Sequence, residues 1–256
     1  MTVNDPGSAR AAELAERLDR VRGRIRAAAP ADSMPTLIVV TKYFPASDVQ
    51  LLAGLGVTDV GENKDQEAAP KAAETAVLGL SWHFIGQLQS NKAKSVVRYA
   101  QAVHSVDRPS LVGALAKAMA AEQQRLAADG QPPRKDLDVF LQVDLRDPSA
   151  AAPGTDAPSG PSRGGASPAD LPALADAAAA ADGLRLAGLM AVAPLGGDPL
   201  EAFGRLRSLS AELQEKYPEA GGISAGMSGD LEAALACGAT HLRIGSDILG
   251  PRPPVR

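Results

Sequence analysis

The feature that most constrains the fold is the repeated alternation of short apolar runs with longer helical stretches. The runs are four to seven residues long, and the stretches between them are rich in Ala, Leu and charged residues. Such alternation predicts strands of a parallel sheet joined by helices, and eight strands is the number in a TIM-type (β/α)8 barrel of the α/β class. The predicted strands are residues 37–41, 58–61, 82–85, 102–106, 138–143, 184–190, 222–225 and 240–244.

Length and patterning agree with a single barrel domain over residues 1–256. The chain length of 256 residues is close to the roughly 250 of a typical barrel. Apolar residues at helical spacing predict an amphipathic helix over residues 9–29, ahead of the first strand. No helix is predicted after the eighth strand, because Pro251, Pro253 and Pro254 would stop it. We therefore expect the N-terminal helix to take the missing place in the outer ring.

Two segments are expected to lie outside the ordered barrel. Residues 1–8 are polar and are predicted to be disordered. Residues 146–168 are rich in Pro, Gly, Ser, Ala and Asp, and such a composition buries too little apolar surface to offset the entropy of ordering. We expect a mobile loop insertion near the mouth of the barrel, and its composition favours a neutral insertion over a lid.

Charge and cysteine content argue against several classes of function. The net charge is −4 and the basic residues are scattered, which argues against a nucleic-acid or anionic-membrane surface. The N-terminus lacks the basic flank and apolar core of a signal peptide, so a cytoplasmic protein is expected. Cys237 is the only cysteine, so no intrachain disulfide forms, and we expect it to pack at a helix end. No metal-ligand spacing, nucleotide-binding glycine motif or serine-hydrolase motif is present.

Lys42 is the residue that most constrains the function. It follows the apolar run 37–41 and precedes a break at Tyr43, Phe44 and Pro45, which places it at the mouth of the predicted barrel. A lysine that is desolvated at such a mouth loses its proton readily and condenses with an aldehyde to form a Schiff base. A solvated or ion-paired lysine is the alternative.

Five motifs in the same order resemble those of the pyridoxal phosphate homeostasis proteins. They are residues 40–42, 59–67, 82–92, 224–234 and 241–250. The resemblance implies a fold-type-III barrel related to the N-terminal domain of alanine racemase. It also implies pyridoxal 5′-phosphate (PLP) as the cofactor, held as an imine on Lys42, and a role in intracellular PLP homeostasis with apo PLP-dependent enzymes as recipients.

Glycine and serine residues after the seventh and eighth strands predict a phosphate site. Gly226, Met227 and Ser228 precede a predicted helix, and Gly245 and Ser246 follow the eighth strand. Backbone N–H groups and hydroxyls of these two loops form a recurring phosphate site in barrels, and glycine permits close approach of the backbone. Ordinary helix capping and an ordinary turn are the alternatives for each loop taken alone.

Arg243 matches the arginine that faces the pyridine nitrogen of PLP in the family that the chain resembles. A guanidinium offers only donors, so the ring nitrogen opposite it must be an unprotonated acceptor. An unprotonated ring is a weaker electron sink, and amino-acid chemistry through a carbanion is then poorly supported. The alternative for Arg243 is an ion pair with an acidic neighbour inside the barrel.

The remaining predicted cofactor-binding residues come from the family motifs. Asn63 follows the second strand, where the family has a polar side chain beside the ring, and Ser224 lies in the seventh strand. His83 either points to the cofactor pocket or makes a hydrogen bond in the core, and the sequence favours neither interpretation. His104 and His241 are predicted to be structural.

The sequence therefore predicts a PLP-binding homeostasis protein without catalytic residues. One alternative is an amino-acid racemase, which needs acid/base groups on both faces of the imine. Racemases take the second group from a C-terminal β domain that we do not expect here, and Tyr43 on an extended strand would project away from Lys42. Another alternative is a barrel enzyme that uses Lys42 as a Schiff-base lysine on a phosphorylated metabolite without PLP.

Overall fold

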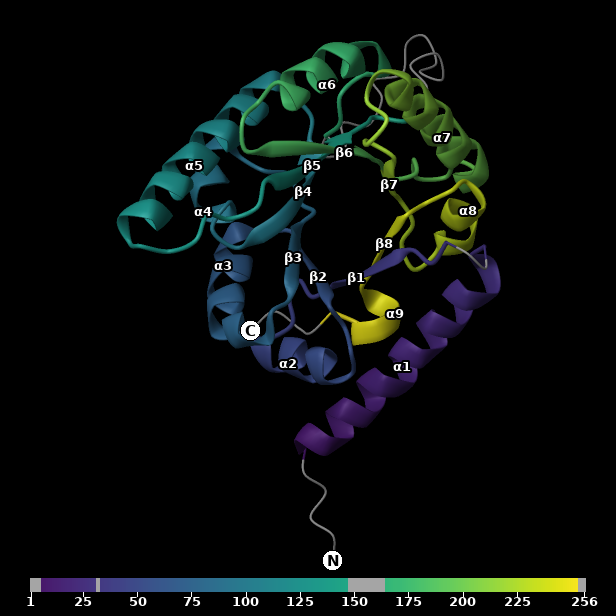
Figure 1. The fold of residues 1–256 in the computed structure, drawn as a ribbon. Helices are drawn as coiled ribbons and strands as arrows, with labels where there is room; N and C mark the ends of the chain where they lie inside the picture. The colour runs from purple at the N-terminus through teal and green to yellow at the C-terminus, as the bar shows by residue number, and fades with distance from the viewer. Residues whose placement is uncertain (1–5, 31–32, 147–163, 253–256) are drawn as a thin grey trace, which may run out of the picture.

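The computed structural model is a closed barrel of eight parallel strands surrounded by helices (Figure 1). It describes residues 6–30, 33–146 and 164–252. The strands follow one another around the barrel in sequence order, and β1 closes it by pairing with β8, where Ile38 lies opposite Arg243. The predicted (β/α)8 TIM-type barrel is confirmed.

All eight predicted strands are present, and their ends differ from the predicted ends by no more than two residues. Helices cover the outer face of the sheet and side chains fill the barrel, so the strands are buried on both faces and read as apolar runs. The strands are β1 (Thr36–Val40), β2 (Asp59–Glu62), β3 (Ser81–Phe84), β4 (Ala100–Val106), β5 (Leu137–Gln142), β6 (Leu184–Met190), β7 (Gly222–Ser224) and β8 (His241–Ile244).

The helices begin where the sequence supplies starting signals. Proline occupies the first turn of α5, α6 and α7, where its missing N–H has no helical partner to lose, and the Asp198 carboxylate caps α7 by accepting from the Leu200 N–H. The helices are α1 (Pro6–Ala28), α2 (Ala46–Gly54), α3 (Asp65–Glu74), α4 (Ala93–Val96), α5 (Pro109–Ala128), α6 (Leu171–Ala179), α7 (Pro199–Lys216), α8 (Leu231–Ala236) and α9 (Ser246–Leu249), with 3-10 turns η1 (Ala76–Leu78), η2 (Ser90–Lys92) and η4 (Pro168–Asp170). None of the described helices is long and apolar enough to cross a membrane.

Helix α1 closes the outer ring beside α8 and α9, as predicted (Figure 1). Its buried stripe is Leu14, Leu18, Val21 and Ile25. The prediction that no helix follows the eighth strand was wrong. Residues between β8 and Pro251 are enough for the single turn of α9, because the proline acts only after that turn has ended.

The two segments expected to be disordered are partly ordered. Helix α1 begins at Pro6, so residues 6–8 are helical, and residues 1–5 lie outside the described residues. In the segment 146–168, residues 147–163 likewise lie outside the described part. Its end is fixed, because the Ala166 N–H donates to the Gln142 carbonyl at 2.8 Å and Ala166 pairs in parallel with Val143.

The hydrophobic core has two layers, because side chains alternate between the two faces of each strand. The larger layer lies between the sheet and the helices, and Cys237 at the end of α8 packs against it in a half-buried position. A small inner cluster fills part of the barrel. It contains Ala102, Phe140, Ala187 and Met190.

Candidate functional site

A cavity opens at the C-terminal ends of the strands, where the active sites of barrel enzymes lie. Its volume is about 440 Å³, within the roughly 300–1,000 Å³ usual for small-molecule sites. Seven of the ten predicted cofactor-binding residues line it, and among the described residues no acidic side chain does. The lining residues are Val40, Lys42, Asn63, Ile85, Met190, Val192, Met227, Ser228, Gly229, Arg243, Gly245 and Ser246.

Lys42 lies two residues beyond the end of β1, and its partly buried side chain forms part of the cavity wall. Among the residues that the structure describes, no carboxylate forms an ion pair with its Nζ atom, whereas other lysines such as Lys71 and Lys216 do form ion pairs. The ion-paired interpretation of Lys42 is therefore not supported. The amine faces the cavity without a competing acid.

The turn that carries Lys42 is fixed from behind by a buried network. The Lys71 Nζ atom donates to the Thr41 carbonyl oxygen at 3.0 Å and to Glu62 Oε1 at 2.7 Å, and the Thr41 hydroxyl donates to the same Oε1 at 2.8 Å. Burial raises the pKa of the Glu62 carboxyl, although the Lys71 and Thr41 hydrogen bonds act in the opposite direction. Breaking such a buried pair is strongly destabilising, so Lys71 and Glu62 hold the Thr41 backbone, and with it Lys42, in place.

Tyr43 does not project away from Lys42, and that prediction was wrong. The chain turns after β1 instead of continuing as a strand, and the Tyr43 backbone is left-handed with a φ of 73°. The Lys42 Nζ atom lies 5.9 Å from the centre of the Tyr43 ring, Lys64 Nζ lies 5.8 Å from it and the Arg252 guanidinium carbon 3.8 Å from it. The Tyr43 ring thus lies close to three cationic side chains beside the turn that carries Lys42.

Asn63 is held at the cavity by a close backbone approach. A Cβ atom at Gly86, after β3, would lie 2.1 Å from the Asn63 carbonyl oxygen, so only glycine lets the two loops come together here. The family motif that contains Gly86 therefore has a steric reason in this structure.

The loops after β7 and β8 converge as predicted. The Ser246 hydroxyl donates to Ser228 Oγ at 3.2 Å, and the Asp247 N–H donates to the same oxygen at 3.4 Å. Gly226 has a φ of 90°, and a Cβ there would lie 2.8 Å from side-chain atoms of Ala234 and Leu242. We call the convergent group of Ser228, Gly229, Gly245 and Ser246 the hydroxyl cup.

Arg24 of helix α1 ties both loops of the hydroxyl cup together, and no sequence pattern predicted this role. Its guanidinium donates to the Ser228 carbonyl oxygen at 3.0 Å, to Asp247 Oδ2 at 2.6 Å, and to the Glu232 carboxylate at 2.7 and 2.9 Å. Helix α1 therefore does more than cover the barrel. It braces the two loops from outside.

Arg243 forms the buried floor of the cavity. Its side chain donates to Ser224 Oγ at 2.6 Å and to the Ala191 carbonyl oxygen at 2.9 Å. No carboxylate among the described residues forms an ion pair with it, so the alternative of an acidic partner is wrong for this part of the chain. Burial lowers the pKa of Arg243 to about 10, which leaves the guanidinium charged at neutral pH.

Three predicted cofactor-binding residues do not line the cavity. His83 and Ser224 are buried in the barrel, where they bond to His104, and Gly226 shapes its loop from beneath. The structure thus favours the core interpretation of His83 over the pocket one. Burial lowers the pKa of His104 well below its usual value and that of His241 to about 4, in line with the structural role predicted for both.

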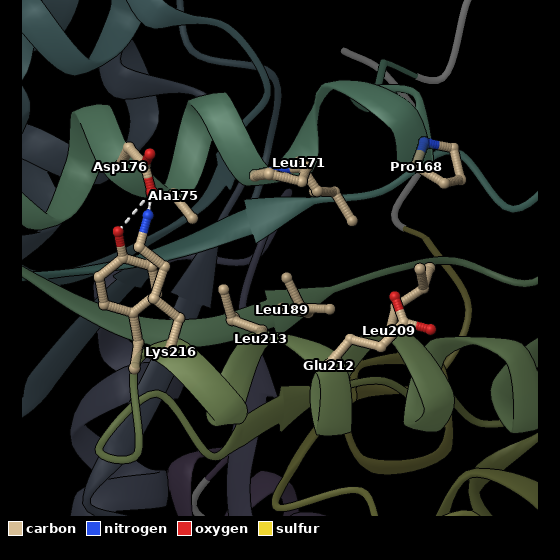
Figure 2. Close-up of a pocket in the computed structure, with 11 residues that line it drawn as sticks. Pro168, Leu171, Ala175, Asp176, Leu189, Leu209, Glu212, Leu213 and Lys216 are labelled. Carbon is tan, nitrogen blue, oxygen red and sulfur yellow. Dashed lines mark hydrogen bonds and ion pairs between the residues drawn. The ribbon is translucent and has the colours of Figure 1, made fainter.

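A second cavity lies in the helical layer between α6 and α7 and contains none of the predicted site residues (Figure 2). Its volume of about 130 Å³ is below the usual range for ligand sites, roughly 300–1,000 Å³. Leu171, Leu189 and Leu213 supply apolar walls, and Lys216 bonds to Asp176 at one end. We assign the candidate site to the mouth of the barrel.

Comparisons with known proteins show the family of the chain. Residues 12–253 match the family model of the alanine racemase N-terminal domain. A pyridoxal phosphate homeostasis protein of Mycobacterium tuberculosis is 39% identical over 95% of this chain and 94% of the relative. The chain belongs to this family. Another member, from Corynebacterium glutamicum, is 41% identical over 85% of this chain and 90% of the relative.

A solved structure of a relative carries the ligand that the family name contains. PipY of Synechococcus elongatus with PLP bound is 32% identical to this chain, covers 93% of it and all of its own length, and has a TM-score of 0.71. The family match confirms the resemblance inferred from the five motifs.

The sequence missed the apolar walls of the cavity and the braces behind it. Val40 precedes Lys42 by two residues, so strand alternation alone would have placed it on the same face. Ile85 directly follows β3, and Val192 lies two residues beyond the end of β6. Arg24 lies 204 to 223 positions from its partners along the chain. Lys71 lies 9 positions from Glu62 and 30 from Thr41, and no local pattern identifies either brace.

Proposed function

We propose that this chain binds PLP in the cavity at the mouth of the barrel and serves in PLP homeostasis. The observation that carries the proposal is that Lys42, Arg243 and the hydroxyl cup line one cavity without an acidic side chain among its described residues. PLP has three groups that such a cavity suits, namely an aldehyde, a ring nitrogen and a phosphate. The PLP-bound relative supports the same ligand.

Each residue would have a separate task. When bound, PLP supplies an aldehyde that condenses reversibly with a primary amine, and Lys42 Nζ is the amine that faces the cavity. The Ser228 and Ser246 hydroxyls and the loop N–H groups would hold the phosphate. Asn63 would flank the ring, and Arg243 would donate a hydrogen bond to the ring nitrogen from below.

Arg243 also argues that the protein holds its cofactor and does not use it for catalysis. Its guanidinium remains charged and only donates, so it gives no proton to the ring nitrogen and does not help the ring to accept electrons from a substrate. We propose that apo PLP-dependent enzymes of the cytoplasm are the recipients. The curated relatives, which are homeostasis proteins, support this over a racemase.

The test is to trap the cofactor. The purified protein loaded with PLP should absorb in the visible range, and borohydride should fix the cofactor on the peptide that contains Lys42. Lys42→Ala should abolish this absorption, while Lys64→Ala, a change at a nearby lysine that does not line this cavity, should leave it unchanged. A label on Lys64 or Lys92 would overturn the assignment.

The carrier role has its own measurement. The loaded protein, mixed with an apo-enzyme that requires PLP, should restore the activity of that enzyme, and Lys42→Ala should change the rate of restoration. Exchange of the α-hydrogen of alanine or serine with solvent deuterium at roughly 1–10³ s⁻¹, the usual range of enzyme turnover, would show a catalyst instead.

A further inference from the structure

A chain of hydrogen bonds runs through the inside of the barrel beneath Arg243. The Arg243 guanidinium bonds to Ser224 Oγ at 2.6 Å, and Ser224 Oγ bonds to His104 Nδ1 at 2.8 Å. His104 Nε2 lies 2.9 Å from His83 Nδ1, and His83 Nε2 lies 2.9 Å from Asp59 Oδ1. The five side chains come from β8, β7, β4, β3 and β2.

The two ends of this chain open into different cavities. Arg243 is the floor of the cavity at the C-terminal end of the barrel, while Asp59, the first residue of β2, lines a depression at the N-terminal end together with Arg22 and Arg26. The middle members His104 and Ser224 are fully buried. This chain of hydrogen bonds therefore connects the candidate site to the opposite face of the protein.

The chemistry of the ends fixes the direction of every bond. Arg243 can only donate, and Asp59 as a carboxylate can only accept. Burial raises the pKa of Asp59, but the hydrogen bonds from His83 and Thr58, together with the nearby charges, lower it by more in total. The pKa therefore lies below its usual value, and Asp59 is ionised at neutral pH. With neutral histidines the protons then have one arrangement: Arg243 donates to Ser224, Ser224 to His104, His104 to His83, and His83 to Asp59.

The reverse arrangement leaves a buried donor unsatisfied. If His104 donated through Nδ1, Ser224 Oγ would accept from both His104 and Arg243, and its own hydrogen would need another acceptor. None bonds to Ser224 among the described residues. A buried hydroxyl without a partner is unfavourable, so the forward direction is the stable one.

The other titratable groups near this chain of hydrogen bonds have hydrogen-bond or ion-pair partners outside it. His241 on β8 bonds to Thr240 and packs edge-on against Phe140, which stacks on the His104 ring at 4.3 Å. An ion pair at this end of the barrel joins Arg185 and Asp138. Asp138 is therefore a matched control for Asp59, since their side chains are 19% and 20% exposed.

We propose that Ser224, His104, His83 and Asp59 form a one-way relay that positions Arg243 for its ligand and lets the charge of Asp59, on the opposite face, influence binding. The relay gives the buried guanidinium a polarised neutral acceptor in place of a carboxylate, so the charge of Arg243 stays available to the cavity. This inference rests on the proposed PLP site. The relay members are positioning residues, because only Arg243 faces the cavity.

The direction of the relay is tested without any ligand. Nitrogen NMR of the wild-type protein without PLP should show both His83 and His104 as neutral rings that carry the proton on Nε2. A proton on His104 Nδ1 would overturn the proposal. Because this measurement needs no cofactor, it decides the relay even if the protein fails to bind PLP and the proposed function is wrong.

The influence on binding is tested with Asp59→Asn against Asp138→Asn. Charge-assisted hydrogen bonds are about twice as strong as neutral ones, so Asp59→Asn should weaken the binding of both PLP and pyridoxal by about three- to tenfold. Loss of a negative charge acting through space would instead strengthen the binding of anionic PLP. Affinities for both ligands that match those of Asp138→Asn, with circular dichroism showing folded proteins, would refute the coupling.

Discussion

Replacing Arg24 by methionine should loosen the hydroxyl cup while leaving Lys42 and Arg243 untouched. Arg24 lies on α1, and its guanidinium joins Glu232 of α8, Asp247 of α9 and the Ser228 carbonyl oxygen. Methionine keeps most of the apolar stem and removes the donors, so the change tests the brace and not the packing of α1.

The magnitude follows from the contacts and their exposure. The Arg24 side chain is 33% exposed, so its ion pairs are worth at most about 1 kcal/mol each. With the hydrogen bond to Ser228 added, we expect the free energy of unfolding to fall by about 1–2 kcal/mol. If the same loss reaches the cup, the affinity for PLP falls by about 5- to 30-fold.

The assay compares PLP with pyridoxal, which lacks the phosphate. Titrations of both ligands should show weaker PLP binding and unchanged pyridoxal binding in Arg24→Met. The control is Arg20→Met on the same helix, because among the described residues Arg20 pairs only with Glu16, along the exposed face. Equal losses for the two ligands, or an Arg24→Met protein that behaves like Arg20→Met, would refute the brace.

Two further predictions concern the cup itself and the pH dependence of stability. Ser228→Ala with Ser246→Ala should weaken PLP by about 1.5–3 kcal/mol for each lost hydrogen bond to the phosphate and spare pyridoxal; titrations that give the same loss for both ligands would contradict the cup. Burial lowers the pKa of His241 from 6.5 to about 4, so its contribution to stability is complete above pH 6.5 and is lost as the pH falls to about 4. The free energy of unfolding from denaturant titrations should fall by about 3 kcal/mol more in the wild type than in His241→Phe over this interval, and parallel profiles would contradict the assignment.

The parts of the site that the sequence predicted are those with local signals. Lys42 stands at the junction of an apolar run and a chain break, and the Gly226–Ser228 and Gly245–Ser246 pairs follow strands at positions that barrels use for phosphate. A strand end, a turn and a glycine each depend on a few neighbouring residues. Their predicted positions therefore differ from those in the structure by no more than one or two residues.

The sequence could not predict how deep a side chain lies in the barrel or which distant segments it contacts. The alternation of β3 places His83 inside the barrel, but only the neighbouring strands decide whether it reaches the cavity or stops beneath it. Tyr43 departs from strand geometry because the chain turns one residue earlier than the apolar run suggests. Arg24 finds its partners more than 200 residues away, at separations of 204 to 223 positions along the chain.

The distribution of charge explains how an acidic protein offers a site for an anion. The net charge is −4, yet the cavity is lined by Lys42 and Arg243 and, among the described residues, by no acid. The acids that stabilise this region point elsewhere: Glu62 faces α3 behind the Lys42 turn, and Asp59 lies at the far end of the barrel. Because local fields in a low-dielectric cavity outweigh the screened charge of the surface, an anion at this mouth meets Lys42 and Arg243, neither of which forms an ion pair with a carboxylate of the described residues.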